Sequence, residues 1–180
     1  MRRPRLHRRR SLLFALLALA LLAVPAAASA ACKYADTLPR HGSDLAHARS
    51  AVLCLVNHER TSRHQKALHS NSTLRAVGTE LARDMVKRHY FDHTTPGGRT
   101  FSDRLQDHDW SGRSAGENIA WGSGRLGTPA NIVDAWMHSP GHRKNILTKS
   151  FRRAGVGIAI GAPERGVGAA ATYSMDYDRP

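Results

Sequence analysis

Two helix-forming segments precede two strand-forming segments in this chain, and that order constrains the fold more than any other feature. From Asp44 to about Ser62, apolar residues recur every three or four positions and define one helical face. A second helix is predicted from a cap at Asn71 to about His89, with the same spacing. The apolar positions are Leu45, Ala48, Val52, Leu55 and Val56 in the first segment and Leu74, Val77, Leu81 and Met85 in the second. Because each helix carries one apolar face, we expect the second to pack against the first.

The middle of the chain is rich in turns and contains three shorter elements. Thr100 to Asp103 is a variant of the capping box, which predicts a short helix through about Gln106. The glycines that follow exclude a long helix, and Glu117 to Trp121 is predicted as a short strand. Thr128-Pro129 begins another helix, because proline is favoured at the first helical position. That helix is expected to stop before Pro140, which disfavours helical geometry at the preceding residue.

The last part of the chain is expected to form an antiparallel hairpin. Residues 154–161 and 168–177 are rich in small and β-branched side chains, and a turn-like APERG separates them. Helices come first, strands come mostly later, and no strand-helix-strand alternation is seen. This order predicts an α+β domain in which helices cover a sheet. We assign residues 44–180 to this one domain and residues 31–43 to an N-terminal lead-in.

Residues 1–30 have the pattern of a secretory signal peptide. Basic residues precede an apolar stretch from Leu12 to Val24, and small residues follow before the predicted cleavage after Ala30. The apolar stretch is shorter than the roughly 18 residues that a membrane span needs, and no later segment approaches that length. The mature protein is therefore expected to be secreted, to the extracellular space or the cell envelope, without an integral membrane span.

The net charge of +13 includes six arginines of the predicted signal peptide. The remaining chain carries 21 basic and 14 acidic residues, a charge that favours attraction to an anionic wall or envelope. The arginines are scattered and no basic run is interleaved with aromatic residues, so a nucleic-acid partner is excluded. A basic surface that is simply solvated would have the same composition.

Cys32 and Cys54 are the only cysteines, and the predicted compartment is oxidising. We therefore expect a disulfide that joins the lead-in to the first helix and stabilises the fold by roughly 3 kcal/mol. Lipidation of Cys32 after cleavage is the alternative, but Ser29-Ala30-Ala31 lacks the leucine expected three residues ahead of a lipidated cysteine.

Three titratable residues lie beside backbone-fixing residues and are the candidates for chemistry: His93, Glu117 and His142. If two imidazoles and a carboxylate met in one cleft, they could bind a divalent metal such as zinc and leave a position for water. The same residues could instead brace the loops, with Arg143 and Asn145 tying the turn at His142 to the sheet. Trp121, Trp136 and Tyr173 are expected in the core.

Other catalytic motifs in the sequence are incomplete or lie in the wrong structural context. His58-Glu59 begins like the zinc-protease motif, but Ser62 occupies the position of the second histidine. Gly112 to Gly116 matches the nucleophile-elbow pattern, but a polar loop precedes it and a predicted strand follows, whereas the elbow requires a strand before it and a helix after it. Cys54 lies in a helix among apolar residues without an activating cation, which indicates a structural role.

Five segments in order resemble the bacterial secreted branch of the CAP superfamily, which comprises cysteine-rich secretory proteins, antigen-five venom proteins and pathogenesis-related proteins. The segments, which span roughly Ala51 to Tyr177, are LCLVNHERTSRHQKALHSNSTL, YFDHTTPGGRTFSDRL, AGENIAWG, IVDAWMHSPGHRKNIL, and RRAGVGIAI with ATYSMDY. The resemblance implies an α-β-α sandwich with a central antiparallel sheet and a central cleft, lined in animal and plant members by two histidines and two acids. His93, Glu117 and His142 match three of those positions. Ser139 stands at the fourth position, where those family members have an acid.

Two functions follow from the resemblance. The first is a noncatalytic extracellular module, expected to be a monomer, that binds a lipid, a cell-wall component or another protein. The second is a metal-assisted hydrolase or peptidase with Glu117 as the general base and the histidines as zinc ligands. The missing fourth acid favours the first, and no activity follows from the fold alone.

Overall fold

The computed structural model describes residues 31–180; the predicted signal peptide lies outside them. The elements follow in the order η1 (Gly42–Asp44), α2 (Leu45–Thr61), β1 (His69–Ser70), α3 (Ser72–Arg88), α4 (Phe101–Asp107), β2 (Ser114–Ser123), η2 (Gly124–Gly127), α5 (Pro129–His138), α6 (Pro140–Ile146), β3 (Arg153–Ile160) and β4 (Ala170–Arg179). The predicted α+β class is confirmed. No helix within residues 31–180 is long and apolar enough to cross a membrane.

The four strands form one sheet in the order β1-β3-β4-β2. β3 and β4 form the predicted antiparallel hairpin, and β4 also pairs antiparallel with β2. β1 adds two residues in parallel to β3, so most of the outer edge of β3 has no neighbouring strand. β2 is longer than predicted, and its pairing aligns Glu117 with Asp176 of β4. This register brings two acidic residues side by side in the middle of the sheet.

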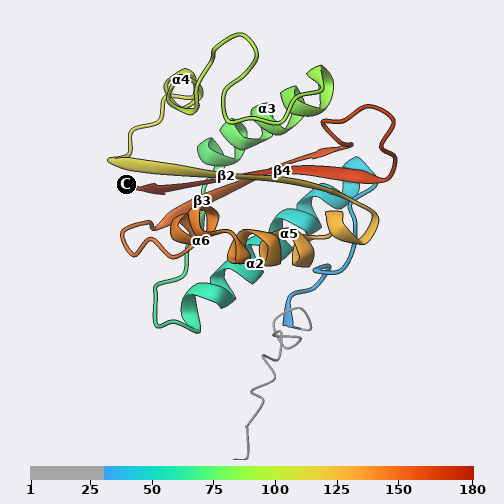
Figure 1. Cartoon of the computed structure of the whole chain (residues 1–180). Coiled ribbons are helices and arrows are strands. Elements are labelled where there is room, and N and C mark those ends of the chain that lie inside the picture. Colours follow the sequence, from blue (N-terminus) through green and yellow to red (C-terminus); the bar gives the residue numbers. More distant parts are fainter. Residues whose placement is uncertain (1–30) are drawn as a thin grey trace, which may run out of the picture.

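Helices cover both faces of the sheet and give the expected α-β-α sandwich (Figure 1). α3 packs on one face against β3 and β4, and α2, α5 and α6 lie on the other. The prediction that the first two helices pack against each other is therefore wrong. Their apolar faces are both buried, but in the two different layers. Helical periodicity indicates that a face is buried and does not indicate which surface buries it.

Glycines allow α3 to lie directly on the sheet. A Cβ atom at Gly157 of β3 would collide with the backbone of Gly78 and Thr79 in α3, and one at Gly155 would collide with the backbone at Arg75. The small residues of the AGVGIAIG segment thus permit close packing of a helix on a strand as well as strand formation.

Local capping signals mark the helix ends as predicted. The Asn71 side chain accepts a hydrogen bond from the Leu74 amide at 2.9 Å, which caps α3. Thr100 and Asp103 form a capping box at the start of α4. Pro129 opens α5, and the backbone at Ser139, before Pro140, is extended and separates α5 from α6.

The main core lies between the sheet and the layer of α2, α5 and α6. Trp136 and Tyr173 are buried in it as predicted, whereas Trp121 is only partly buried. The predicted disulfide between Cys32 and Cys54 is present, with 5.8 Å between the Cα atoms, so Cys32 has no free thiol. Cys32, Ala35 and Leu38 of the lead-in are themselves buried. The lead-in is therefore part of the packed core as well as being tethered by the disulfide.

Candidate functional site

The structure brings two of the three candidate residues into direct contact. His93 lies in the loop between α3 and α4, and its Nδ1 is 2.8 Å from Oε1 of Glu117 on β2. The His93 side chain is 51% exposed, whereas that of Glu117 is 2% exposed. The hydrogen bond to Glu117 raises the pKa of His93 above its ordinary value, because the carboxylate stabilises the charged ring.

His142 lies on the other side of β2. Asn118, the neighbour of Glu117, donates to the carbonyl oxygen of His142 at 3.0 Å. Successive side chains of a strand point to opposite faces, so Glu117 faces the layer of α3 and α4 while α6 packs against the Asn118 face. Among the described residues, no hydrogen bond or ion pair joins His142 to Glu117. Burial lowers the pKa of His142, and the charge of His93 lowers it further.

A buried arginine completes the surroundings of Glu117. The guanidinium of Arg104 on α4 donates to both Glu117 oxygens, at 2.8 and 3.1 Å, and also to the His93 carbonyl oxygen at 3.0 Å. The Arg104 side chain is completely buried. A carboxylate in this environment requires a partner of opposite charge. Arg104 therefore neutralises Glu117 within the fold.

Arg104 was not among the residues predicted from the sequence. It occurs in the TFSDRL part of the family-like segment, one residue before the buried Leu105. An arginine in a short helix is usually exposed, so its position alone gives no sign of burial. The available signal was indirect, since an acid expected in the interior needs a cation nearby.

A second acid lies beside Glu117 without a cation of its own among the described residues. Asp176 on β4 is fully buried, and its Oδ2 has no hydrogen-bond partner. The hydroxyl of Ser174 lies 3.3 Å from Asp176 Oδ1 and 3.4 Å from Glu117 Oε2, between the two acids. Burial, and then the charge of Glu117, raise the pKa of Asp176 well above its usual range. A protonated Asp176 leaves one negative charge, on Glu117, to balance Arg104.

Two asparagines of the family-like segments join α6 to the sheet. Asn145 donates to the Glu117 carbonyl oxygen at 3.1 Å and to Oδ1 of Asn118 at 2.9 Å. Asn118 also donates to the hydroxyl of the buried Tyr177 at 3.2 Å. Asn145 thus ties the turn at His142 to the sheet, as the bracing interpretation expected. Arg143 does not, because it is exposed and has no hydrogen bond to the sheet within residues 31–180.

The remaining candidate, Ser139, is the N-cap residue of α6, and its side chain makes no capping hydrogen bond. Asp134, the nearest acid on the preceding helix, is exposed and pairs with His138 at 3.4 Å. Neither residue adds an acidic group to Glu117.

These residues do not fit a zinc ion. Within residues 31–180, no group of three or more His, Cys, Asp or Glu side chains is arranged to hold a metal. Both oxygens of Glu117 accept from a guanidinium, and His93 directs Nδ1 at the same carboxylate. A fixed positive charge at this carboxylate opposes a second cation there.

Comparison with known proteins assigns the chain to one family. The model of the "Cysteine-rich secretory protein family" (CAP) matches residues 53–177. The protein YkwD of Bacillus subtilis (strain 168) is 36% identical over 130 residues, which are 72% of this chain and 49% of YkwD. The membrane protein YlbC of the same organism is 31% identical over 107 residues, 59% of this chain and 30% of YlbC. The chain thus spans half or less of the length of these relatives.

Solved structures show the same fold. An extracellular protein containing an SCP domain from Bacillus anthracis str. Ames superposes with a TM-score of 0.64 at 25% identity, covering 79% of this chain and 45% of that one. An outer surface protein of Borrelia burgdorferi also gives a TM-score of 0.64, at 18% identity, covering 78% of this chain and 96% of that one. Both similarities extend over most of residues 31–180.

Proposed function

Because the chain belongs to the cysteine-rich secretory protein family, as its sequence motifs indicated, we propose that it is a secreted, noncatalytic module that binds a component of the cell envelope. The predicted signal peptide supports export. The similar structures described as an extracellular protein and as an outer surface protein support a location outside the cytoplasm. The match covers 45% of the first of these chains and 96% of the second, so the proposal concerns only the fold that both share with this chain.

The observation that carries the proposal is the neutralisation of Glu117. A general base needs a lone pair that is free to accept a proton from a substrate or water. Arg104 donates to both oxygens of Glu117, and His93 occupies one of them as well. The charge of this acid is used to hold α4, the His93 loop and β2 together. The residues expected to act on a substrate are therefore better explained as a rigid support for a binding surface.

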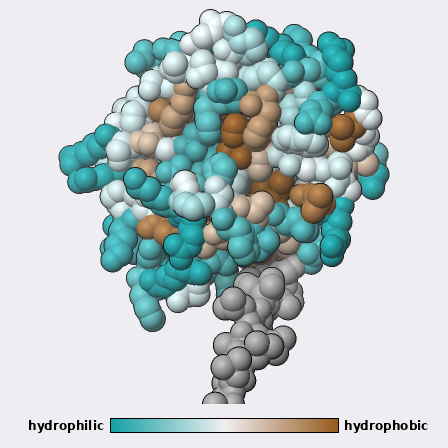
Figure 2. Space-filling view, viewed as in Figure 1, coloured by the Kyte–Doolittle hydropathy of each residue, from teal (hydrophilic) through white to brown (hydrophobic). Residues whose placement is uncertain are grey.

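The surface favours a polar ligand. The face seen in Figure 2 is mostly hydrophilic, with apolar residues in several separate groups. Among residues 31–180, the exposed large apolar side chains are Phe91, Leu126 and Ile160. A lipid tail needs a continuous apolar surface, whereas an anionic wall component is attracted by the excess of basic residues. We therefore favour a polar, anionic component of the envelope.

The proposal is tested with the purified secreted protein. We expect it to sediment with isolated cell envelopes and to release no fragments from casein or from peptidoglycan. The same measurements on Glu117→Gln and His93→Gln reveal any catalytic use of this site, and His93→Gln serves if Glu117→Gln does not fold. Hydrolysis by the wild type that both variants lose would overturn the noncatalytic assignment. Failure to sediment with any envelope fraction would overturn the binding role.

A further inference from the structure

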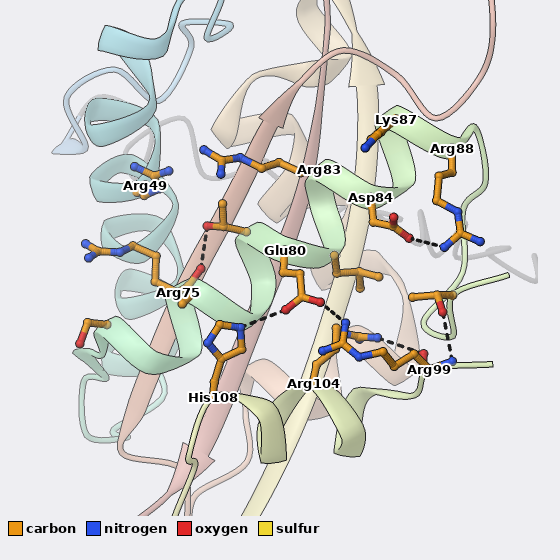
Figure 3. Close-up of a pocket in the computed structure, with 15 residues that line it drawn as sticks. Arg49, Arg75, Glu80, Arg83, Asp84, Lys87, Arg88, Arg99, Arg104 and His108 are labelled. Carbon is orange, nitrogen blue, oxygen red and sulfur yellow. Dashed lines mark hydrogen bonds and ion pairs between the residues drawn. The ribbon is translucent and has the colours of Figure 1, made fainter. Parts of the chain in front are cut away.

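A basic groove lies over the outer side of α3, and one of its lining residues is Arg104, the partner of Glu117. It has a volume of about 880 Å³ and is lined by residues of α2, α3 and α4 and by the loops on either side of α4 (Figure 3). A second hollow of about 250 Å³ lies at the open edge of β3. Arg49 of α2 and Arg75 of α3 line both hollows, so these two arginines lie where the hollows meet.

The acids of the groove are already paired with other groups. Glu80 pairs with Arg99 and, at 3.0 Å, with His108. Asp84 pairs with Arg88 at 3.3 Å (Figure 3). It also accepts a hydrogen bond from Tyr90 at 2.7 Å. Both acids of the groove are therefore already paired and do not neutralise its other basic residues.

Three arginines of the groove remain without an acid. Within residues 31–180, no carboxylate pairs with Arg49, Arg75 or Arg83. Figure 3 shows the side chains of Arg75 and Arg83 extending from α3 toward α2, where Arg49 lies. The two residues of α3 are eight positions apart, about two helical turns. Two elements thus direct three guanidinium groups toward one region.

Arg49 is the member of this group that most needs a partner. Its Nε is inaccessible to solvent and has no hydrogen-bond partner. Burial lowers the pKa of Arg49, and the charges of Arg75 and Arg83 lower it further. Three positive charges near one another, one of them partly buried, are unfavourable without a counter-charge. An anion between them would remove this repulsion.

We propose that Arg49, Arg75 and Arg83 form a binding site for a phosphate group. A guanidinium presents a planar fork of donors that matches phosphate oxygens, and the several oxygens of a phosphate can accept from more than one fork. A carboxylate has two oxygens, which one fork occupies. Hydroxyl groups from Ser50 and Ser70 in the smaller hollow and from Ser72 in the groove are further donors.

The inference rests on the proposed envelope-binding role and names the chemistry of its ligand. The arginines line a recess, so a soluble phosphate ester or a phosphate-bearing polymer can enter, whereas a flat bilayer surface meets the rim. We therefore favour a soluble or wall-polymer source of the phosphate over a lipid headgroup.

Isothermal titration of the full secreted protein with sn-glycerol 3-phosphate, at constant ionic strength, tests the site. We expect Arg49→Gln to weaken binding about tenfold, as the loss of one charge-assisted contact does. Replacement of all three arginines by glutamine is expected to abolish binding. Arg165→Gln is the matched control, because Arg165 is exposed and lies outside the groove. Equal weakening by Arg49→Gln and Arg165→Gln, or no effect of the triple variant, would overturn the site.

Vesicles of phosphatidylglycerol distinguish the source of the phosphate. Binding to glycerol 3-phosphate without binding to vesicles supports the soluble source. Vesicle binding that the triple variant loses assigns the same phosphate site to lipid headgroups. The envelope sedimentation assay separates the two proposals. A triple variant that sediments like the wild type overturns the phosphate site and leaves the envelope-binding role intact. A wild type that binds phosphate but does not sediment overturns the envelope-binding role and leaves the phosphate site intact.

Discussion

Arg104 and Arg49 border the same groove but have opposite surroundings. Arg104 is completely buried and donates to both oxygens of Glu117 and to a backbone carbonyl. Arg49 is partly buried, has a buried Nε without a partner, and is influenced by two further arginines. The Nε of Arg104 is likewise buried without a hydrogen-bond partner, so what separates the two arginines is the carboxylate. Arg104 is paired with Glu117, whereas no acid within residues 31–180 pairs with Arg49, which can therefore bind an anion.

The difference separates residues that maintain the fold from residues available to a ligand. Arg60 of α2 belongs with Arg104: it is fully buried and donates to the carbonyl oxygens of Lys66, Ile146, Thr148 and Phe151. The prominent residues of the family-like segments, Glu117, Asn118 and Asn145, likewise bond within the protein. A recognisable motif in this chain is thus better evidence for how the fold is braced than for where a ligand binds.

The strongest test of this contrast is Arg104→Met. The variant leaves Glu117 as a buried charge without its cation, which is expected to lower the free energy of unfolding by about 3–5 kcal/mol. Urea denaturation followed by circular dichroism measures the change.

The double variant Arg104→Met/Glu117→Met provides the control. It removes both charges, so we expect it to be more stable than Arg104→Met alone. Arg113→Met, at an exposed position, is expected to change stability by less than about 0.5 kcal/mol. If Arg104→Met and Arg113→Met behaved alike, the structural role of the Arg104 pair would be refuted.

The second test concerns the proton on Asp176. Its pKa is raised in the folded state, so the folded protein retains a proton that the unfolded chain loses above about pH 4. The stabilisation from this group is complete below the unfolded pKa and is lost as pH rises toward the folded pKa. While the folded carboxyl keeps its proton, the loss is about 1.4 kcal/mol per pH unit.

Asp176→Asn removes that proton and its pH dependence. Urea titrations of both proteins between pH 4 and pH 8 should show the stability of the variant, relative to the wild type, increasing with pH. A constant difference across this range would mean that Asp176 is ionised in the fold.

Much of the fold followed from local sequence signals. The caps at Asn71 and Thr100, and Pro129 at the first position of α5, marked helix starts because they act on adjacent backbone. β2 was predicted too short because its glycines resemble turn residues. A Cβ at Gly116 would lie 3.1 Å from Oδ1 of Asn145, so this glycine permits α6 to pack closely on the strand.

The candidate site was less predictable because it depends on contacts between distant segments. The family-like segments named His93 and Glu117, which do meet, and His142, which lies beyond the strand from Glu117. Arg104 and Asp176 were missed. The sequence did contain a signal for Asp176, because it is an acid within the apolar strand ATYSMDY. Acids are rarely buried, so an acid at such a position indicates a special role.

The two histidines give a smaller test. Glu117 raises the pKa of His93, whereas burial lowers that of His142, so NMR titration should place their pKa values on opposite sides of 6.5. Stabilisation from His93 is complete below the unfolded pKa and is lost as pH rises through the folded value. It is at most about 1 kcal/mol, because the ring is half exposed.

His93→Gln should raise the pKa of His142, and an unchanged value would show that the rings do not interact.

The smallest expected effect comes from Arg49→Met, and its sign is what matters. Methionine keeps an aliphatic side chain against α2 and α3 but removes the charge that Arg75 and Arg83 repel. At low ionic strength we expect the free energy of unfolding to rise by about 0.5 kcal/mol, whereas Arg104→Met lowers it. Near 1 M salt the gain should disappear, because the screening length falls to about 3 Å. Arg165→Met, which removes an exposed charge elsewhere, controls for the change in net charge. Destabilisation by Arg49→Met at low salt would mean that Arg49, like Arg104, stabilises the fold.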